Sequence, residues 1–212
     1  MTGNDLLAGR TAHWARTLTA IPSVTGTRDE ADFAGKLAAL LRESPAFARP
    51  SGLVWTLDVP GGAHPRQCVL GLVRGAGART IVLTGHFDTV ETGGYGPLEP
   101  LALDPDRLGP ALVARIGEEP HEARAAQAAK DLADGAFIAG RGLLDMKAGL
   151  AAGLAVIEKL ASAPFDGNLL FIAVPDEEGN SAGARRISQA LAGIAAEHGL
   201  STRWVEAGDK TR

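Results

Sequence analysis

The chain has 212 residues, of which 45% are hydrophobic and 22% charged, and its formal net charge is −4 at pH 7. These values are those of an ordinary globular protein, large enough for one α/β domain or for one domain and part of another. The acidic balance gives no reason to expect nucleic acid or an anionic membrane as a partner. No apolar run reaches the ~18 residues of a membrane span, and the first twenty residues lack a signal-peptide core. The single cysteine, Cys68, lies in an apolar stretch, so we expect a cytoplasmic protein in which Cys68 is a buried strand residue.

The first half of the chain predicts two helices followed by three strands. Residues 4–20 have the pattern of a helix, and Thr27 and Glu30 have the spacing of a capping box at the start of a second helix. Three strand-like runs come next, at residues 53–59, 68–73 and 79–84. The last of these, RTIVLT, is short and apolar, as expected for a strand that is buried on both faces.

The second half begins with a change of composition at residues 91–135. Residues 94–109 are rich in proline and glycine and predict a loop, and residues 118–135 predict an alanine-rich surface helix that acts as a solvated spacer. Beyond them the pattern predicts a helix at 148–161, a strand at 168–174, a helix at 181–197 and a last strand that begins at 203. Strands that alternate with helices predict an α/β fold, with a mostly parallel twisted sheet and helices on both faces.

Three polar clusters come after a strand or border a helix, which is where α/β folds gather functional groups. They are GHFDTV at residues 85–90, GRGLLDMK at 140–147 and DEEG at 176–179. Each alone has an ordinary explanation, since a histidine at a strand end is commonly a surface residue, an acidic run is commonly solvated, and Asp145 could cap a helix. Together, in this order, they supply an imidazole and several carboxylates, which are ligands suited to zinc, cobalt or manganese.

These clusters resemble the motifs of the peptidase M20 family of metallohydrolases. HFDTV is similar to the family's H-x-D-x-V, GRGLLDMKAG to its G-R-G-x-x-D-M-K-x-G, DEEG to its E-E-G, and IPSV at residues 21–24 to its I-P-S-x-S/T start. Within the family, FDTVETGGYGPLEPLALDPDRL and the long stretch before GRG are most similar to the arginine utilization protein RocB group. The resemblance implies a zinc-peptidase fold of the phosphorylase/hydrolase-like type. Residues 1–212 would be the amino-terminal part of the catalytic metal-binding domain, with 91–135 as an insertion.

The resemblance also implies a metal site. His86 would bind one metal ion, and Asp88 would orient the His86 ring by accepting its other N–H. Asp145 would bridge two divalent ions, for which we expect zinc, with cobalt or manganese as alternatives. The family pattern further implies a cis peptide bond between Asp145 and Met146.

The remaining roles fall on the acidic run and on the end of the chain. By the same resemblance, Glu177 would be the general base that takes a proton from the attacking water, and Glu178 would be a ligand of the second metal. The first metal normally has one more carboxylate ligand, in a G-E-P-T-like sequence. Asp209 in GDKT matches that sequence in place, and Glu206 is the alternative.

The chain departs from the family pattern after these motifs. Family members also have a lid and dimerisation domain and a late histidine that completes the second metal site, and neither occurs before Arg212. We therefore expect a fragment of a longer enzyme, from which the lid domain is absent; a truncated product is the alternative. The other histidines lie outside any matching motif and are expected at the surface: His13, His64, His121 and His198.

The function expected from these motifs is hydrolysis of an amide bond in a small peptide or N-acyl amino acid, in the catabolism of arginine or other amino acids. The full-length protein is expected to be a homodimer. The competing hypothesis is a non-catalytic metal-binding domain on the same fold, against which the intact acidic pair argues. A dinucleotide-binding function is not supported, because no G-x-G-x-x-G run lies between a predicted strand and a helix.

Overall fold

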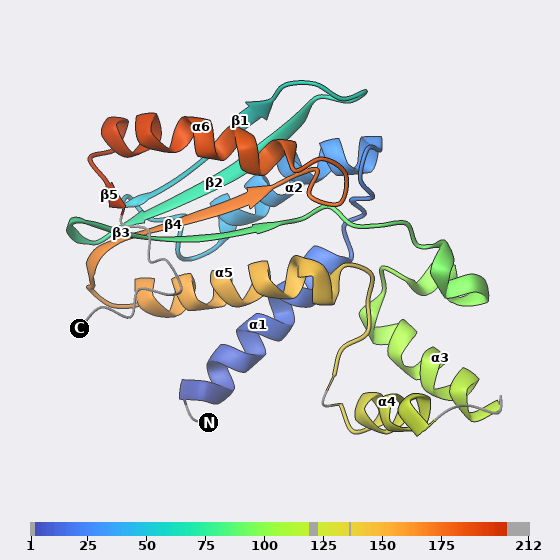
Figure 1. Ribbon diagram of the computed structural model, residues 1–212. Coiled ribbons are helices and arrows are strands. Elements are labelled where there is room, and N and C mark those ends of the chain that lie inside the picture. Colours follow the sequence, from blue (N-terminus) through green and yellow to red (C-terminus); the bar gives the residue numbers. More distant parts are fainter. Residues whose placement is uncertain (1–2, 119–122, 136, 203–212) are drawn as a thin grey trace, which may run out of the picture.

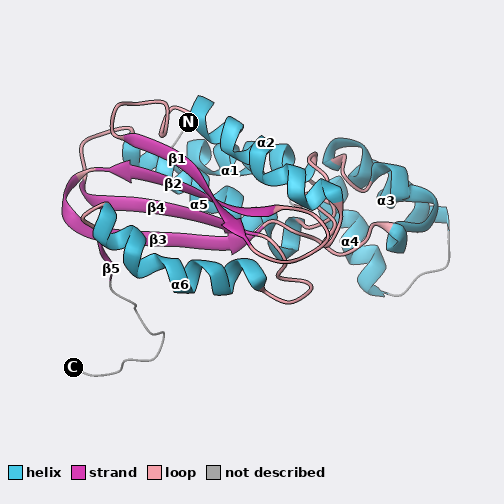
Figure 2. Cartoon of the chain, turned by 90° about the horizontal axis from the view of Figure 1, so that it is seen from above, coloured by secondary structure: helices cyan, strands magenta, loops and turns pink. Residues whose placement is uncertain are grey.

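The computed structural model describes residues 3–118, 123–135 and 137–202. Its five strands form one sheet in the order β1-β2-β4-β3-β5, and helices cover both faces of that sheet (Figures 1 and 2). The elements are α1 (Gly3–Thr19), α2 (Arg28–Glu43), β1 (Gly52–Val59), β2 (Arg66–Arg74), β3 (Ala76–His86), the 3-10 helix η1 (Gly93–Leu101), α3 (Pro105–Glu118), α4 (Ala123–Ala133), the irregular turn η2 (Leu143–Lys147), α5 (Ala148–Ala161), β4 (Asp166–Val174), α6 (Ala182–Glu197) and β5 (Ser201–Thr202).

The α/β class with helices on both faces is confirmed, but the sheet is mixed rather than mostly parallel. β1 pairs antiparallel with β2, and β2 pairs antiparallel with β4, whereas β3 is parallel to both β4 and β5. The expectation of a mostly parallel sheet overlooked the connection between β1 and β2, which is only residues 60–65. Two strands joined in this way pair antiparallel, since a parallel pair needs a crossover of about a dozen residues or more.

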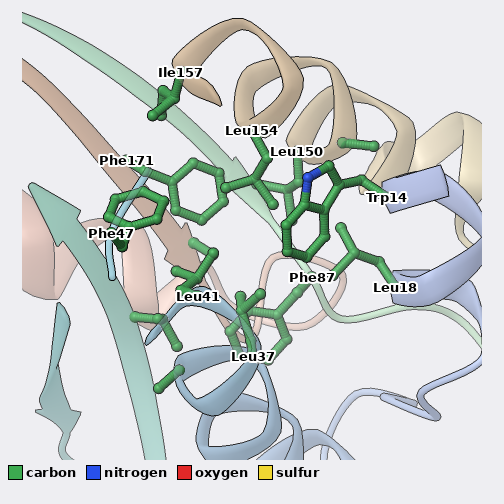
Figure 3. Close-up of a cluster of buried hydrophobic side chains, with 14 of the residues drawn as sticks. Trp14, Leu18, Leu37, Leu41, Phe47, Phe87, Leu150, Leu154, Ile157 and Phe171 are labelled. Atoms are coloured by element: carbon green, nitrogen blue, oxygen red, sulfur yellow. The ribbon is translucent and has the colours of Figure 1, made fainter. Parts of the chain in front are cut away.

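The strands separate two apolar clusters by the alternation of their side chains. On β4, Leu169 and Phe171 face α1, α2 and α5, whereas Leu170 and Ile172 face α6. Figure 3 shows the larger cluster, which draws its side chains from three helices, the sheet and the segments that follow α2 and β3: Trp14, Leu18, Leu37, Leu41, Phe47, Phe87, Leu150, Leu154, Ile157 and Phe171. Because Phe87 directly follows β3, this core fixes the chain at the point where the polar clusters begin.

Helix α2 begins as the capping box predicts. The Thr27 hydroxyl accepts the backbone N–H of Glu30 at 3.4 Å. The Glu30 carboxylate reaches back to the N–H of Gly26, at 2.7 Å, one residue before the one that the motif normally uses. Glu30 is fully buried there, so it lies inside the fold and not on its surface.

The prediction of a loop at residues 94–109 is wrong, because this segment holds η1 and the start of α3. The Asp104 carboxylate accepts the backbone N–H of Arg107 at 3.2 Å, and Pro105 is the first residue of α3. An aspartate cap followed by a proline is a helix start, since proline has no N–H to leave unpaired there. The predicted surface helix is present as α4, which buries no residue. Figures 1 and 2 show α3 and α4 beyond one end of the sheet.

Most other predicted elements lie within a few residues of their observed bounds. Cys68 is fully buried in β2, as predicted. β5 pairs with β3 through Ser201 and Thr202; the strand predicted from residue 203 onward lies outside the described residues. In the described part of the chain, no helix is long and apolar enough to cross a membrane.

The histidines outside the motifs take no part in a metal-ligand cluster within the described residues. His13 is exposed, and His64 and His198 are partly exposed. The His198 ring lies 5.1 Å from the ring of Trp55. His121 lies outside the described residues.

Candidate metal centre

The polar clusters meet at the carboxyl ends of two parallel strands. β3 ends at His86 and its neighbour β4 at Val174, and these two residues are partners in the register of the sheet. The N–H of Phe87 donates to the Val174 carbonyl at 3.0 Å, so the segments after both strands leave the sheet side by side. This edge is where ligands bind in open α/β sheets.

His86 presents one ring nitrogen to this edge. Its Nδ1 lies 3.0 Å from the backbone carbonyl oxygen of Asp88. A carbonyl only accepts hydrogen bonds, so Nδ1 carries a proton, and Nε2 is the ring nitrogen directed at the site, which can bind a cation once it has lost its own proton. Nε2 lies 2.9 Å from Asp145 Oδ1 and 3.9 Å from Glu177 Oε2.

Acidic groups converge on this nitrogen from two other segments. One ligand atom each from His86, Glu177 and Glu178 lies within 4.8 Å of the others, and Asp145 contacts Nε2 directly. Burial alone would lower the pKa of His86, but its hydrogen bonds to Asp88 and Asp145 raise that pKa to about 9. Burial and the nearby Asp145 carboxylate raise the pKa of Glu178. The three carboxylates beside one imidazole give the site a surplus of negative charge that a bound cation would neutralise, and this donor set fits a divalent metal.

The carboxylate of Asp88 binds the loop that carries Glu177 and Glu178, and not the His86 ring. Its Oδ1 lies 3.6 Å from His86 Nδ1, which is too far for a hydrogen bond, and accepts the N–H of Glu177 at 3.0 Å. Its Oδ2 accepts the N–H of Glu178 at 3.1 Å and the hydroxyl of Thr25 at 2.8 Å. Burial would raise the pKa of Asp88, but the adjacent His86 ring and these donors hold it below its ordinary value. The expectation that the Asp88 carboxylate accepts the His86 N–H is therefore corrected, since its backbone carbonyl takes that proton.

A buried ion pair holds the other side of the same loop. Asp176, just before the two glutamates, has a left-handed backbone with φ of 69°, and its carboxylate pairs with Arg66 of β2. The Asp176 carboxylate also accepts the N–H of Ala182 at 3.1 Å. Arg66 Nη1 lies 3.9 Å from the buried Glu30 carboxylate. The loop that carries Glu177 and Glu178 is thus held in place by the buried ion pairs of Arg66 with Asp176 and Glu30.

The GRGLLDMK motif turns sharply beside the site. Gly142 has φ of 74°, and a Cβ built on it would lie 2.3 Å from Thr89 Cγ2, so only glycine fits this position. The Asp145–Met146 peptide bond is cis, as expected. This turn directs the Asp145 carboxylate towards His86.

Lys147, the last residue of that motif, is fully buried. Its Nζ donates to the carbonyl oxygens of Leu18 and Ile21, at 3.0 and 2.8 Å, and lies 4.8 Å from the centre of the Phe33 ring. Burial lowers the pKa of Lys147 to about 7. The side chain joins the start of α5 to the end of α1, so it positions the motif.

Sequence reasoning assigned no role to Thr25, Arg66, Asp176 or Lys147 at this site. Thr25 carried a signal, because it is the fifth residue of IPSVT, where the family motif has Ser or Thr. Its N–H donates to the Thr89 carbonyl at 3.0 Å, so this segment lies along HFDTV. Arg66 gave no signal, since a basic residue next to a proline-rich loop is ordinarily exposed. Its burial depends on partners more than thirty residues away.

Of the predicted site residues, the fold brings four together and places a fifth beside them. Four of them converge at the carboxyl ends of β3 and β4: His86, Asp145, Glu177 and Glu178. Asp88 binds the backbone of the loop that carries the two glutamates. The last carboxylate ligand, predicted as Asp209 with Glu206 as the alternative, lies outside the described residues.

Sequence comparisons agree with these motifs. The model for the family described as Peptidase family M20/M25/M40 matches residues 116–207. The uncharacterized protein YqjN of Bacillus subtilis is 31% identical over 201 residues, which are 94% of this chain and 34% of YqjN. Protein RocB of the same organism is 29% identical over 173 residues, 79% of this chain and 29% of RocB. The chain therefore spans about a third of the length of these relatives.

Solved structures share the fold at low sequence identity. Human carnosine dipeptidase 1 is 16% identical, with a TM-score of 0.57 over 88% of this chain and 36% of its own. The di-peptidase Dug1p of Saccharomyces cerevisiae is 15% identical, with a TM-score of 0.56 over the same shares. The LapA aminopeptidase of Legionella pneumophila is 12% identical, with a TM-score of 0.55 over 96% of this chain and 43% of its own. The family match and the two relatives that align along most of the chain show that this chain is similar to peptidase family M20/M25/M40, and the solved structures show that it shares their fold.

Proposed function

We propose that the protein is a metal-dependent hydrolase that cleaves the amide bond of a small peptide or an N-acyl amino acid. The observation that supports it is the convergence of His86, Asp145, Glu177 and Glu178 at the carboxyl ends of β3 and β4. Similarity to a peptidase family supports the same reaction class. Similarity to Protein RocB, together with the segment from Phe87 to Leu108, supports a place in arginine or other amino-acid catabolism.

The proposal includes a division of the chain. Residues 1–212 form the amino-terminal part of the catalytic metal-binding domain, and residues 91–135 are an insertion, in keeping with the position of α3 and α4 beyond the end of the sheet (Figure 1). Because the chain spans about a third of its relatives, the activity belongs to the whole protein, which we propose to be a homodimer.

The donor set fits divalent metal, and we propose two ions in the complete protein, most simply zinc, with cobalt or manganese as alternatives. His86 would hold the first ion, Asp145 would bridge both, and Glu178 would hold the second. Asp209, or Glu206 in its place, would complete the first set. Bound there, the ions would lower the pKa of a water ligand towards ~7 and polarise the scissile carbonyl.

The chain's own groups supply the proton transfers. Glu177, whose side chain is 48% exposed at the mouth of the site, would accept a proton from the attacking water and deliver it to the leaving nitrogen. Asp88 would keep Glu177 in reach by holding its backbone N–H. The Nδ1–H of His86, fixed by the carbonyl of Asp88, keeps Nε2 directed at the site.

The test is Glu177→Gln in the complete natural protein, loaded with zinc. Amine release from a panel of dipeptides and N-acetyl amino acids should fall by about 10²–10⁴-fold, since general-base catalysis contributes that much, while the bound zinc measured by mass spectrometry stays constant. The matched control is Glu197→Gln, an exposed residue at the end of α6, which should keep wild-type turnover. Undiminished turnover by Glu177→Gln would contradict the proposal. One ion or none per chain, with no hydrolysis of the panel by the wild type, would support the alternative of a non-catalytic metal-binding domain.

A further inference from the structure

Beside the acidic groups lies a cavity of about 380 Å³ that the proposed reaction leaves unexplained. Asp145 and Glu178 line one part of it, and Tyr95 and Arg141 line another. This volume is within the range of small-molecule sites, in which a few polar groups fix the orientation of a ligand. The cavity is therefore a candidate for the part of the substrate next to the scissile bond.

Arg141 is the only basic side chain among the described residues that line this cavity. Its Cζ lies 4.9 Å from the centre of the Tyr95 ring, within the range of a cation–π contact. Its Nε is buried without a hydrogen-bond partner, and within the described part of the chain it forms no ion pair with a carboxylate. A guanidinium held in this way costs free energy until an acceptor reaches it.

The cation is held in place by the insertion. The backbone N–H of Arg141 donates to the Ala102 carbonyl at 2.8 Å, and Tyr95 belongs to η1, in the same insertion. Gly94 lies beside the guanidinium, since a Cβ built on it would be 3.6 Å from Arg141 Nη2. The guanidinium plane is thus set by contacts on its face and at its backbone, and its N–H donors remain for a ligand.

We infer that Arg141, supported by Tyr95, is a specificity-determining residue that binds a carboxylate of the substrate in this cavity. The inference rests on the proposed function and names the residue that would select, among its substrates, those with a free carboxylate close to the scissile bond. A guanidinium recognises a carboxylate through paired N–H donors, and an uncharged amide at that position leaves the same donors poorly matched.

The test measures binding, so it does not depend on turnover. The complete protein with Glu177→Gln, loaded with zinc, is titrated calorimetrically with N-acetylglycine and with its uncharged analogue N-acetylglycinamide. The acid should bind more tightly than the amide, and adding Arg141→Met should reduce this preference by about 10- to 100-fold, the value of a hydrogen-bonded charge. Arg141→Lys should restore part of it, because a point charge remains without the paired donors. Tyr95→Leu should weaken the acid selectively, since the aromatic support is lost.

The control is Arg28→Met, which removes an exposed arginine at the start of α2 and should keep the wild-type preference. A preference for the acid that survives Arg141→Met overturns the inference, since the carboxylate is then bound elsewhere. Loss of thermal stability in Arg141→Met with an unchanged acid-to-amide ratio also overturns it, because Arg141 would then only tie the insertion to the motif. If the parent protein binds N-acetylglycine no more tightly than N-acetylglycinamide, the inference is also overturned. If the preference depends on Arg141 but the wild type hydrolyses no amide, the inference stands and the proposed function fails.

Discussion

The buried carboxylate of Asp88 accepts a hydrogen bond from the backbone N–H of Glu177, with 3.0 Å between Asp88 Oδ1 and the Glu177 nitrogen. These residues are 89 positions apart in the sequence. The contact joins the segment after β3 to the loop after β4, and a second bond from the N–H of Glu178 to Asp88 Oδ2 makes the attachment bidentate. The position of the proposed base is therefore set by the residue two places after the proposed histidine ligand.

Asp88→Asn should impair the site without unfolding the protein. An asparagine keeps one oxygen acceptor, but its amide NH₂ cannot accept the second N–H or the Thr25 hydroxyl. Because the groups that orient metal ligands typically contribute 10–100-fold, we expect zinc affinity or kcat/KM to fall by about that factor. Zinc titration and steady-state kinetics measure it. Asp29→Asn, an exposed change in the first turn of α2, is the control; equal values for both variants would show that Asp88 does not position the loop.

Arg66→Met should be among the most destabilising single substitutions. It removes the cation between Asp176 and Glu30 and leaves two buried carboxylates uncompensated. Breaking such a buried pair costs about 3–5 kcal/mol, which denaturant unfolding of the complete protein measures. Arg28→Met breaks an exposed pair with Asp32, where the side chains are 82% and 50% exposed, and should cost at most ~1 kcal/mol. A similar loss in both variants would show that burial of the Arg66 pair is unimportant.

Gly142→Ala should destabilise the turn that presents Asp145. The new Cβ would lie 2.3 Å from Thr89 Cγ2, and the alanine would have to adopt the positive φ of Gly142. We expect the free energy of unfolding to fall by about 1–3 kcal/mol. Gly193→Ala in α6 is the matched control, since a Cβ there meets nothing within 4 Å. That variant should be more stable by about 0.5–1 kcal/mol, because glycine weakens a helix interior. Denaturant unfolding should show a lower free energy of unfolding for Gly142→Ala and a higher one for Gly193→Ala. A stabilising Gly142→Ala would contradict the observed turn.

Cys68 should be unreactive in the folded protein. Burial raises the pKa of its thiol to about 12, so the folded state retains a proton that the unfolded state releases. Its contribution to stability is therefore complete below pH ~8.5, the pKa of an exposed thiol, and is lost as the pH rises towards about 12. Labelling by a thiol reagent at pH 8 should be slow until denaturant is added. Rapid labelling of the native protein would show that the thiol is accessible.

Much of the site could be predicted because its ligands lie in short segments with strong local signals. His86, Asp145, Glu177 and Glu178 each belong to a short motif next to a strand or helix. The cis peptide after Asp145 was also expected from the motif and is present. Local pattern failed at residues 94–109, where a composition typical of loops conceals an Asp-Pro helix start.

What the sequence by itself determined is the alternation of strands and helices, the resemblance to a family and the residue types of the candidate site. These depend on local periodicity and on motifs that are contiguous in the chain. Only the tertiary structure decided which groups support the site. Arg66 meets Asp176 across 110 positions and Lys147 meets Leu18 across 129. The mixed sheet, too, depends on which strands become neighbours. A charge is stable in the interior only when a partner reaches it, and such partners are brought together by folding, not by sequence spacing.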